Sequence, residues 1–166
     1  MGKMDDLRIY NRALTWGEVG SLQSGEGVVA ADADGDGMAD VWETQYFGGT
    51  NSVNGSASLD LDGDGYSNLS EYILGTDPTL ASSTFRLSIT FNNGNEVVSY
   101  PTIAASGAAY YGKTRYYDLQ SAANVVTGPW ANVPGAADVV GNNAVVNYTN
   151  LFPERYRFFR VKVRLQ

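Results

Sequence analysis

The chain of 166 residues contains no cysteine and no histidine, and each absence removes classes of function. Without cysteine there can be neither a disulfide framework nor a thiolate zinc site. Without histidine the chain lacks the commonest general base, the nucleophile pairs that depend on it, and imidazole metal ligands. We therefore expect a protein that is not an enzyme and that binds any metal through oxygen atoms.

Long apolar runs and an excess of basic residues are also missing. No stretch approaches the roughly 18 apolar residues of a membrane span, and the first 25 residues lack the apolar core of a signal peptide. We expect no membrane insertion, and an export signal would have to lie on sequence outside this chain. The net charge of −7 and the pI near 4.4 argue against nucleic acid as a partner.

The charge is distributed unevenly. Residues 1–84 carry 3 basic and 14 acidic side chains, a net charge of −11, whereas residues 85–166 carry 8 and 4, a net charge of +4. A hydrophobic content of 43% is typical of globular proteins. The shift in composition predicts a boundary near Pro78–Thr84, and we expect three segments, 1–27, 28–80 and 84–166.

Most acidic residues of the middle segment fall in two stretches of 12 residues, DADGDGMADVWE (32–43) and DLDGDGYSNLSE (60–71). A 12-residue calcium loop supplies oxygen ligands from positions 1, 3, 5, 7, 9 and 12, with glycine at position 6 where the chain turns sharply. Gly37 and Gly65 occupy position 6. The expected ligands are Asp32, Asp34, Asp36, Met38 (carbonyl), Asp40 and Glu43 in the first loop, and Asp60, Asp62, Asp64, Tyr66 (carbonyl), Asn68 and Glu71 in the second.

Electrostatics favours a bound cation over a solvated acidic linker. The first loop gathers five carboxylates and the second four, and close like charges repel by about 1 kcal/mol per pair even near the surface. A linker would not need glycine at position 6 and glutamate at position 12 in both copies. The sequence predicts two Ca²⁺ ions, because Mg²⁺ requires a smaller octahedral site and keeps its waters.

Each loop continues into a helix-like segment, VWETQYFGG or LSEYILGTDP, whereas SGEGVVAA and NGSAS, which precede the loops, predict no entering helix. Calcium sensors open by moving one long helix against another. A pair of units this small cannot bury enough apolar area alone, so metal should supply much of its folding energy. This favours a structural role for calcium. The expected core of the pair is Trp42, Tyr46, Phe47, Leu69, Tyr72, Ile73 and Leu74.

The stretch 32–79 resembles the bacterial thrombospondin type 3-like calcium repeats, which are EF-hand-like. The resemblance implies a secreted or cell-surface bacterial protein in which the repeats form a spacer between domains, and it suggests Asp77 as an extra ligand. Dockerins also use paired loop–helix units. However, Val41-Trp42 and Leu69-Ser70 do not form the matched polar pair expected for cohesin recognition.

The first segment holds a strand-like run at Leu7–Tyr10 and a helix-like piece at Thr15–Leu22, too little to bury a core. Its sequence DDLRIYNRALT resembles the end of a laminin-G-like (concanavalin A-like) jelly-roll domain. This resemblance implies that the chain is the C-terminal piece of a longer protein. An N-terminal arm that packs on the next module is the alternative.

From Thr84 onward the apolar period becomes two, as in β-strands. In FRLSITF (85–91) the apolar residues should share one face, and Asn-Gly within 92–95 predicts a hairpin. The neighbouring aromatics Phe158-Phe159 predict a bulge in the last strand. Further strands are expected at 96–103, 114–121, 130–133, 144–149 and 156–165.

The segment from Thr114 onward resembles C-terminal fibronectin-III-like modules of bacterial exported proteins. The expected fold class is mainly β, with a small paired loop-helix calcium module joined to an antiparallel Ig/fibronectin-III-like β-sandwich. The leading hypothesis is that calcium rigidifies the link between neighbouring domains of a larger chain. The alternative is a carbohydrate-binding or adhesive module braced by calcium.

Two groups of side chains bear on that alternative. An aromatic group is either a flat surface on which sugars stack or part of the sandwich core. A basic stripe on the last strand either protects a sheet edge or contacts anionic glycans or a neighbouring domain. The aromatic group is Tyr110, Tyr111, Tyr116, Tyr117 and Trp130, and the stripe is Arg160, Lys162 and Arg164.

Overall fold

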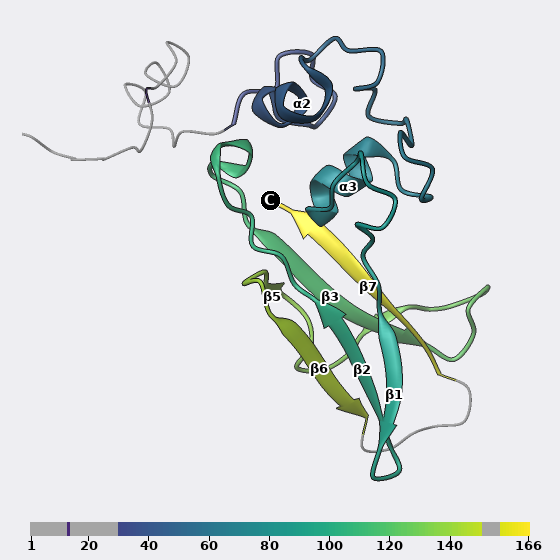
Figure 1. The fold of residues 1–166 in the computed structure, drawn as a ribbon. Helices are drawn as coiled ribbons and strands as arrows, with labels where there is room; N and C mark the ends of the chain where they lie inside the picture. The colour runs from purple at the N-terminus through teal and green to yellow at the C-terminus, as the bar shows by residue number, and fades with distance from the viewer. Residues whose placement is uncertain (1–12, 14–29, 151–156) are drawn as a thin grey trace, which may run out of the picture.

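The computed structural model describes residues 13, 30–150 and 157–166 (Figure 1). This part of the chain is mainly β and antiparallel, and its helices are α2 (Asp40–Phe47), α3 (Asn68–Leu74) and the 3-10 helix η1 (Ala108–Tyr110). No helix among these residues has the length and apolarity to cross a membrane. The strand predicted at Leu7–Tyr10 and the helix predicted at Thr15–Leu22 lie outside the described residues.

The strands of the described residues form two antiparallel sheets. One sheet has the order β1–β2–β6; in the other, β3 pairs with β4, with β5 and, along its whole length, with β7. We refer to residues 84–166 as the two-sheet part and to residues 30–80 as the loop–helix part, which caps one end of the sheets in Figure 1. The strands are β1 (Ser88–Asn92), β2 (Asn95–Pro101), β3 (Arg115–Ala122), β4 (Ala131–Asn132), β5 (Val139–Val140), β6 (Val145–Asn150) and β7 (Phe158–Leu165).

The main hydrophobic core lies between the two sheets. Alternate residues of β2, Val98 and Tyr100, and of β3, Tyr117 and Leu119, are fully buried in it. This is the outcome that the period of two predicts, because successive strand residues point to opposite faces. Partly buried residues complete the core: Phe85, Leu87, Val139, Val146, Tyr148, Phe159, Val161 and Val163.

The predicted hairpin is confirmed. Strands β1 and β2 pair from Ser88↔Ser99 to Asn92↔Asn95. The two loop residues have positive φ, 50° at Asn93 and 80° at Gly94. A two-residue turn of this kind matches the twist of the strands it joins, which explains the Asn-Gly preference.

Two predictions about strands were wrong, and one strand was missed. The stretch 85–91 is not one strand with a buried face: β1 begins only at Ser88, and Phe91 is 72% exposed. The reason is that β1 is the edge strand of its sheet, and all five of its residues are exposed. No bulge occurs at Phe158-Phe159, because the strand begins at Phe158, which takes the outer face and pairs with Ala122. The short strand β5 was not predicted.

A second core joins the loop–helix part to the two-sheet part. Its buried members Met38, Ala39, Trp42 and Tyr72 come from the loop–helix part, and Ala109, Tyr110 and Leu165 of the two-sheet part pack against them. The Tyr72 hydroxyl donates to the Ala109 carbonyl at 2.8 Å, and the Tyr110 hydroxyl donates to the Tyr72 carbonyl at 3.0 Å. The two tyrosine rings stack with centroids 5.0 Å apart. The loop–helix part therefore shares its apolar core with the two-sheet part.

Candidate metal centre

The two acidic loops have the same backbone conformation. At position 1, Asp32 accepts hydrogen bonds from the N–H groups of Gly35 and Gly37, at 2.8 and 3.1 Å. Asp60 accepts the equivalent bonds from Gly63 and Gly65, at 2.8 and 3.0 Å. The position-6 glycines have φ of +96° and +98°, a region that non-glycine residues rarely adopt. The glycine that the sequence pattern required is therefore used as expected in both copies.

Each loop brings three aspartates together. Carboxylate oxygens of Asp32, Asp34 and Asp36 lie within 4.8 Å of one another, and those of the second triplet do so as well. Either triplet could hold a metal ion. Such spacing of like charges is unfavourable without a cation between them. The second triplet is Asp60, Asp62 and Asp64.

The glutamates at position 12 of the two loops are buried, which is unusual for carboxylates in an acidic surface region. Glu43 and Glu71 are fully buried. Both carboxylate oxygens of Glu43 and one of Glu71 have no hydrogen-bond partner. Burial, reinforced by the neighbouring aspartates, raises the pKa of each glutamate to about 7. Buried carboxylates are normally paired or bound to metal, so these two groups fit an oxygen-coordinated cation.

The second loop carries further buried oxygens that lack a partner. One carboxylate oxygen each of Asp62 and Asp64, and the amide oxygen of Asn68, are buried without a hydrogen bond. The Asn68 amide nitrogen donates to the carbonyls of Asn54 and Ser56, both at 2.9 Å, which fixes the orientation of its oxygen. These atoms add unsatisfied acceptors to the same loop, as a cation site would require.

The remaining predicted ligands have other contacts as well. At position 9 of the first loop, Asp40 accepts a hydrogen bond from the Ala33 N–H at 2.7 Å. Met38 and Tyr66 were expected to contribute carbonyls; the Met38 side chain is buried in the second core, and the Tyr66 hydroxyl donates to the Phe85 carbonyl at 3.3 Å.

The helices that follow the loops place the glutamates. Helix α2 starts at position 9 of the first loop and α3 at position 9 of the second, so each glutamate lies in a first helical turn. Both helices end at a left-handed glycine, Gly48 or Gly75, as predicted. No helix occupies residues 50–60, so the second loop has no entering helix. Most of the segment before the first loop lies outside the described residues.

Three residues around Glu71 extend the site beyond the 12-residue pattern. The Thr76 hydroxyl donates to Glu71 Oε1 at 3.1 Å, and Thr76 is itself buried. Asp77 lies close enough to raise the pKa of Glu71, but its own Oδ1 accepts from the N–H and hydroxyl of Thr79. Arg115, on strand β3, donates hydrogen bonds to backbone carbonyls at the end of α3. The sequence suggested Asp77 alone, since nothing local marks the other two.

The aromatic group and the basic stripe of the two-sheet part have separate surroundings. Tyr117 is buried in the main core, and Tyr110 stacks on Tyr72, so these rings do not share one outer surface with Trp130. On β7, the Arg160 guanidinium lies 4.4 Å from the Trp130 ring centroid. Arg164 pairs with Asp118 and Asp138.

Comparison of the chain with protein-family models, with curated proteins and with solved structures gave no match. The resemblances to calcium repeats and to the flanking domains therefore remain predictions from the sequence.

Proposed function

We propose that the two loops bind one Ca²⁺ each and that calcium stabilises this region of a larger, secreted or cell-surface bacterial protein. The proposal is carried by Glu43 and Glu71: two position-12 carboxylates that are fully buried, lack partners for three of their four oxygens and lie close to an aspartate triplet. Leaving such groups unpaired costs free energy that a cation would remove.

The choice of Ca²⁺ follows from the donor atoms and the loop length. All candidate ligands are oxygens, which suit Ca²⁺, Mg²⁺ or Mn²⁺ better than softer metals. A glutamate at position 12 that can offer two oxygens favours the larger Ca²⁺, which accepts six to eight ligands. When bound, Ca²⁺ supplies the positive charge that lets the crowded carboxylates stay ionised; the chain itself supplies the loop geometry and the buried glutamates.

The role that we propose is structural. The loop–helix part shares its apolar core with the two-sheet part, so an ion that fixes the loops also fixes how the two parts are joined. In the parent protein this would make the region a rigid spacer between neighbouring domains, with the two-sheet part as an Ig/fibronectin-III-like sandwich. This setting rests on the sequence resemblances.

Calorimetry on chelator-stripped protein tests the proposal. We expect two Ca²⁺ per chain, and loss of one site in each of the matched variants Glu43→Gln and Glu71→Gln, which keep side-chain size but remove the charge. A second carboxylate elsewhere serves as the control: Glu96→Gln should leave both sites intact, because Glu96 lies on β2, outside the loops. Protein that takes up no Ca²⁺, or two variants with unchanged stoichiometry and affinity, would refute the assignment.

A further inference from the structure

The two loops differ in how the rest of the molecule supports them. Helix α2 has no basic residue in its last turn, and Glu43 accepts no hydrogen bond from a side chain. Helix α3 also has no basic residue of its own in its last turn. A positive charge from a distant strand lies there instead: the guanidinium of Arg115, the first residue of β3, contacts the C-terminal end of α3.

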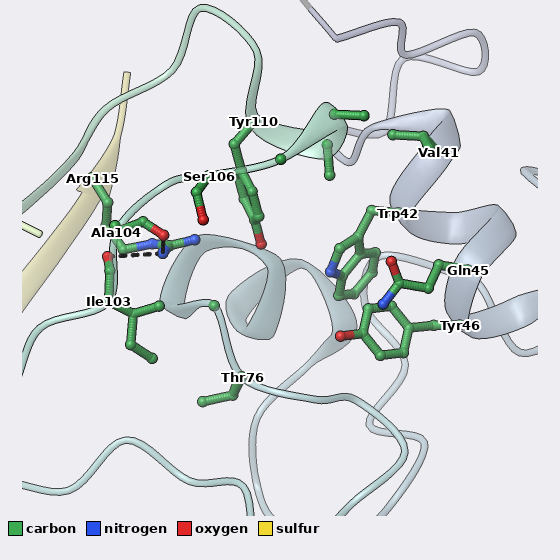
Figure 2. Close-up of a pocket in the computed structure, with 14 residues that line it drawn as sticks. Val41, Trp42, Gln45, Tyr46, Thr76, Ile103, Ala104, Ser106, Tyr110 and Arg115 are labelled. Carbon is green, nitrogen blue, oxygen red and sulfur yellow. Dashed lines mark hydrogen bonds between the residues drawn. The ribbon is translucent and has the colours of Figure 1, made fainter. Parts of the chain in front are cut away.

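Arg115 joins the end of α3 to the two-sheet part through backbone carbonyls. Its Nε donates to the Ile73 carbonyl at 2.5 Å and its Nη2 to the Tyr72 carbonyl at 3.2 Å. Its Nη1 donates to the carbonyls of Ile103 and Ala104, at 3.0 and 3.2 Å, as Figure 2 shows in part. The side chain is 1% exposed, and no acidic side chain of the described residues pairs with it.

The negative end of the α3 dipole therefore supplies much of the compensation for this buried charge. A charge buried without such acceptors would be strongly destabilising. The buried guanidinium therefore depends on the carbonyls at the C-terminal end of α3, and Arg115 in turn fixes the position of that end of the helix.

The guanidinium also fixes the turn that follows α3. A Cβ at Gly75 would lie 2.7 Å from Arg115 Nη1 and 2.9 Å from Cζ, so the guanidinium packs directly on the glycine. The N–H groups of Gly75 and Thr76 both donate to the Glu71 carbonyl, at 2.6 and 3.1 Å. This turn places the Thr76 hydroxyl on Glu71 Oε1. One continuous path of contacts therefore connects Arg115 with the position-12 carboxylate of the second loop.

We propose that Arg115 is a positioning residue for the second metal loop alone. It fixes the last turn of α3 and, through Thr76, the orientation of the Glu71 carboxylate. The inference rests on the proposed function, namely that the loops bind Ca²⁺. It adds that the affinity of the second loop depends on a residue of the two-sheet part, whereas the affinity of the first does not. By linkage, calcium in the second loop should stabilise the surroundings of Arg115 to the same extent.

A site-resolved NMR titration with Ca²⁺ tests this on the full chain. The Gly37 and Gly65 amides report the two loops separately, because each donates to the position-1 aspartate of its own loop. In Arg115→Met and in Thr76→Val we expect the second loop to lose about tenfold or more in affinity, the usual effect of removing a group that orients a ligand. The first loop should keep its affinity, and Arg115→Lys, which retains the charge, should recover part of the loss.

The exposed Arg160, which pairs with Gln120 near the opposite end of β3 from Arg115, provides the matched control: Arg160→Met should change neither loop. If Arg115→Met does not fold, Arg115→Lys and Thr76→Val decide the question by the same criterion. Variants that leave the second loop unchanged, or that weaken both loops equally, would overturn the inference. Absence of any calcium response from both amides of the unmodified protein would instead reject the proposed function.

Discussion

Removal of calcium should release the loop–helix part from the two-sheet part. Five carboxylate oxygens of Glu43, Asp62, Asp64 and Glu71 are buried without a hydrogen-bond partner. At about 1–3 kcal/mol for each unsatisfied polar atom, they would cost about 5–15 kcal/mol without a cation. That range equals the whole stability of a typical domain. Helices of 8 and 7 residues are only marginally stable by themselves, so they add little to offset this cost.

Trp42 reports this change because it is 3% exposed and packs against Tyr46, Phe47 and Tyr72. We would replace Trp16 and Trp130 by phenylalanine, so that Trp42 is the only fluorophore of its kind. Excess chelator at pH 8 should shift its emission to the red and remove the near-ultraviolet circular dichroism of the aromatic cluster. Millimolar Ca²⁺ should restore both signals.

Sodium chloride at matched ionic strength is the control, since salt screens exposed charges but does not occupy the loops. If the chelated protein kept the blue-shifted emission of a buried indole and an unchanged melting temperature, the reasoning from unsatisfied oxygens would be wrong.

The pKa values of Glu43 and Glu71, raised from 4.5 to about 7, mean that the folded chelated protein binds more protons than the unfolded chain between these values. Its melting temperature in chelator should therefore rise as pH falls from about 8 to about 5. The melting temperature of calcium-loaded protein should instead fall, because protons compete with Ca²⁺ for the carboxylates. Circular dichroism melts at several pH values, with and without Ca²⁺, would show whether the two slopes differ in sign. Gly65→Ala should cost about 1–2 kcal/mol through its positive φ. Gly37→Ala should cost more, because its Cβ would also lie 3.3 Å from Leu69 Cδ1, and calcium-loaded melts that rank the two the other way would count against the described loop packing.

The features that the sequence predicted well are those set by neighbouring residues. The loop glycines, the helix-ending glycines and the Asn93-Gly94 turn each depend on a local backbone requirement that few other residues meet. The alternation in β7, which places Phe159, Val161 and Val163 against the main core, likewise follows from a period that the chain displays directly. Such signals predicted the two acidic loops and their following helices to within a residue or two.

The features that the sequence did not predict depend on distant partners. Arg115 lies 42 and 43 residues from the helix carbonyls that it binds, and no spacing rule connects them. Exposure of Phe91 depends on the position of β1 at the edge of its sheet, and β5 is a two-residue strand defined only by its pairing with Tyr116 and Tyr117. These outcomes are decided by tertiary contacts, which a pattern in one segment does not contain.

The apolar cluster around Trp42 and Tyr72, completed by Tyr110 and Leu165, limits how this protein can be re-engineered. If residues 30–80 were grafted onto another scaffold, these rings would be exposed to water and would promote aggregation. A transplant would have to carry substitutes for η1 and the end of β7. The acidic repeats are therefore not an independent module, and any transfer of them to another protein must include the junction with the two-sheet part.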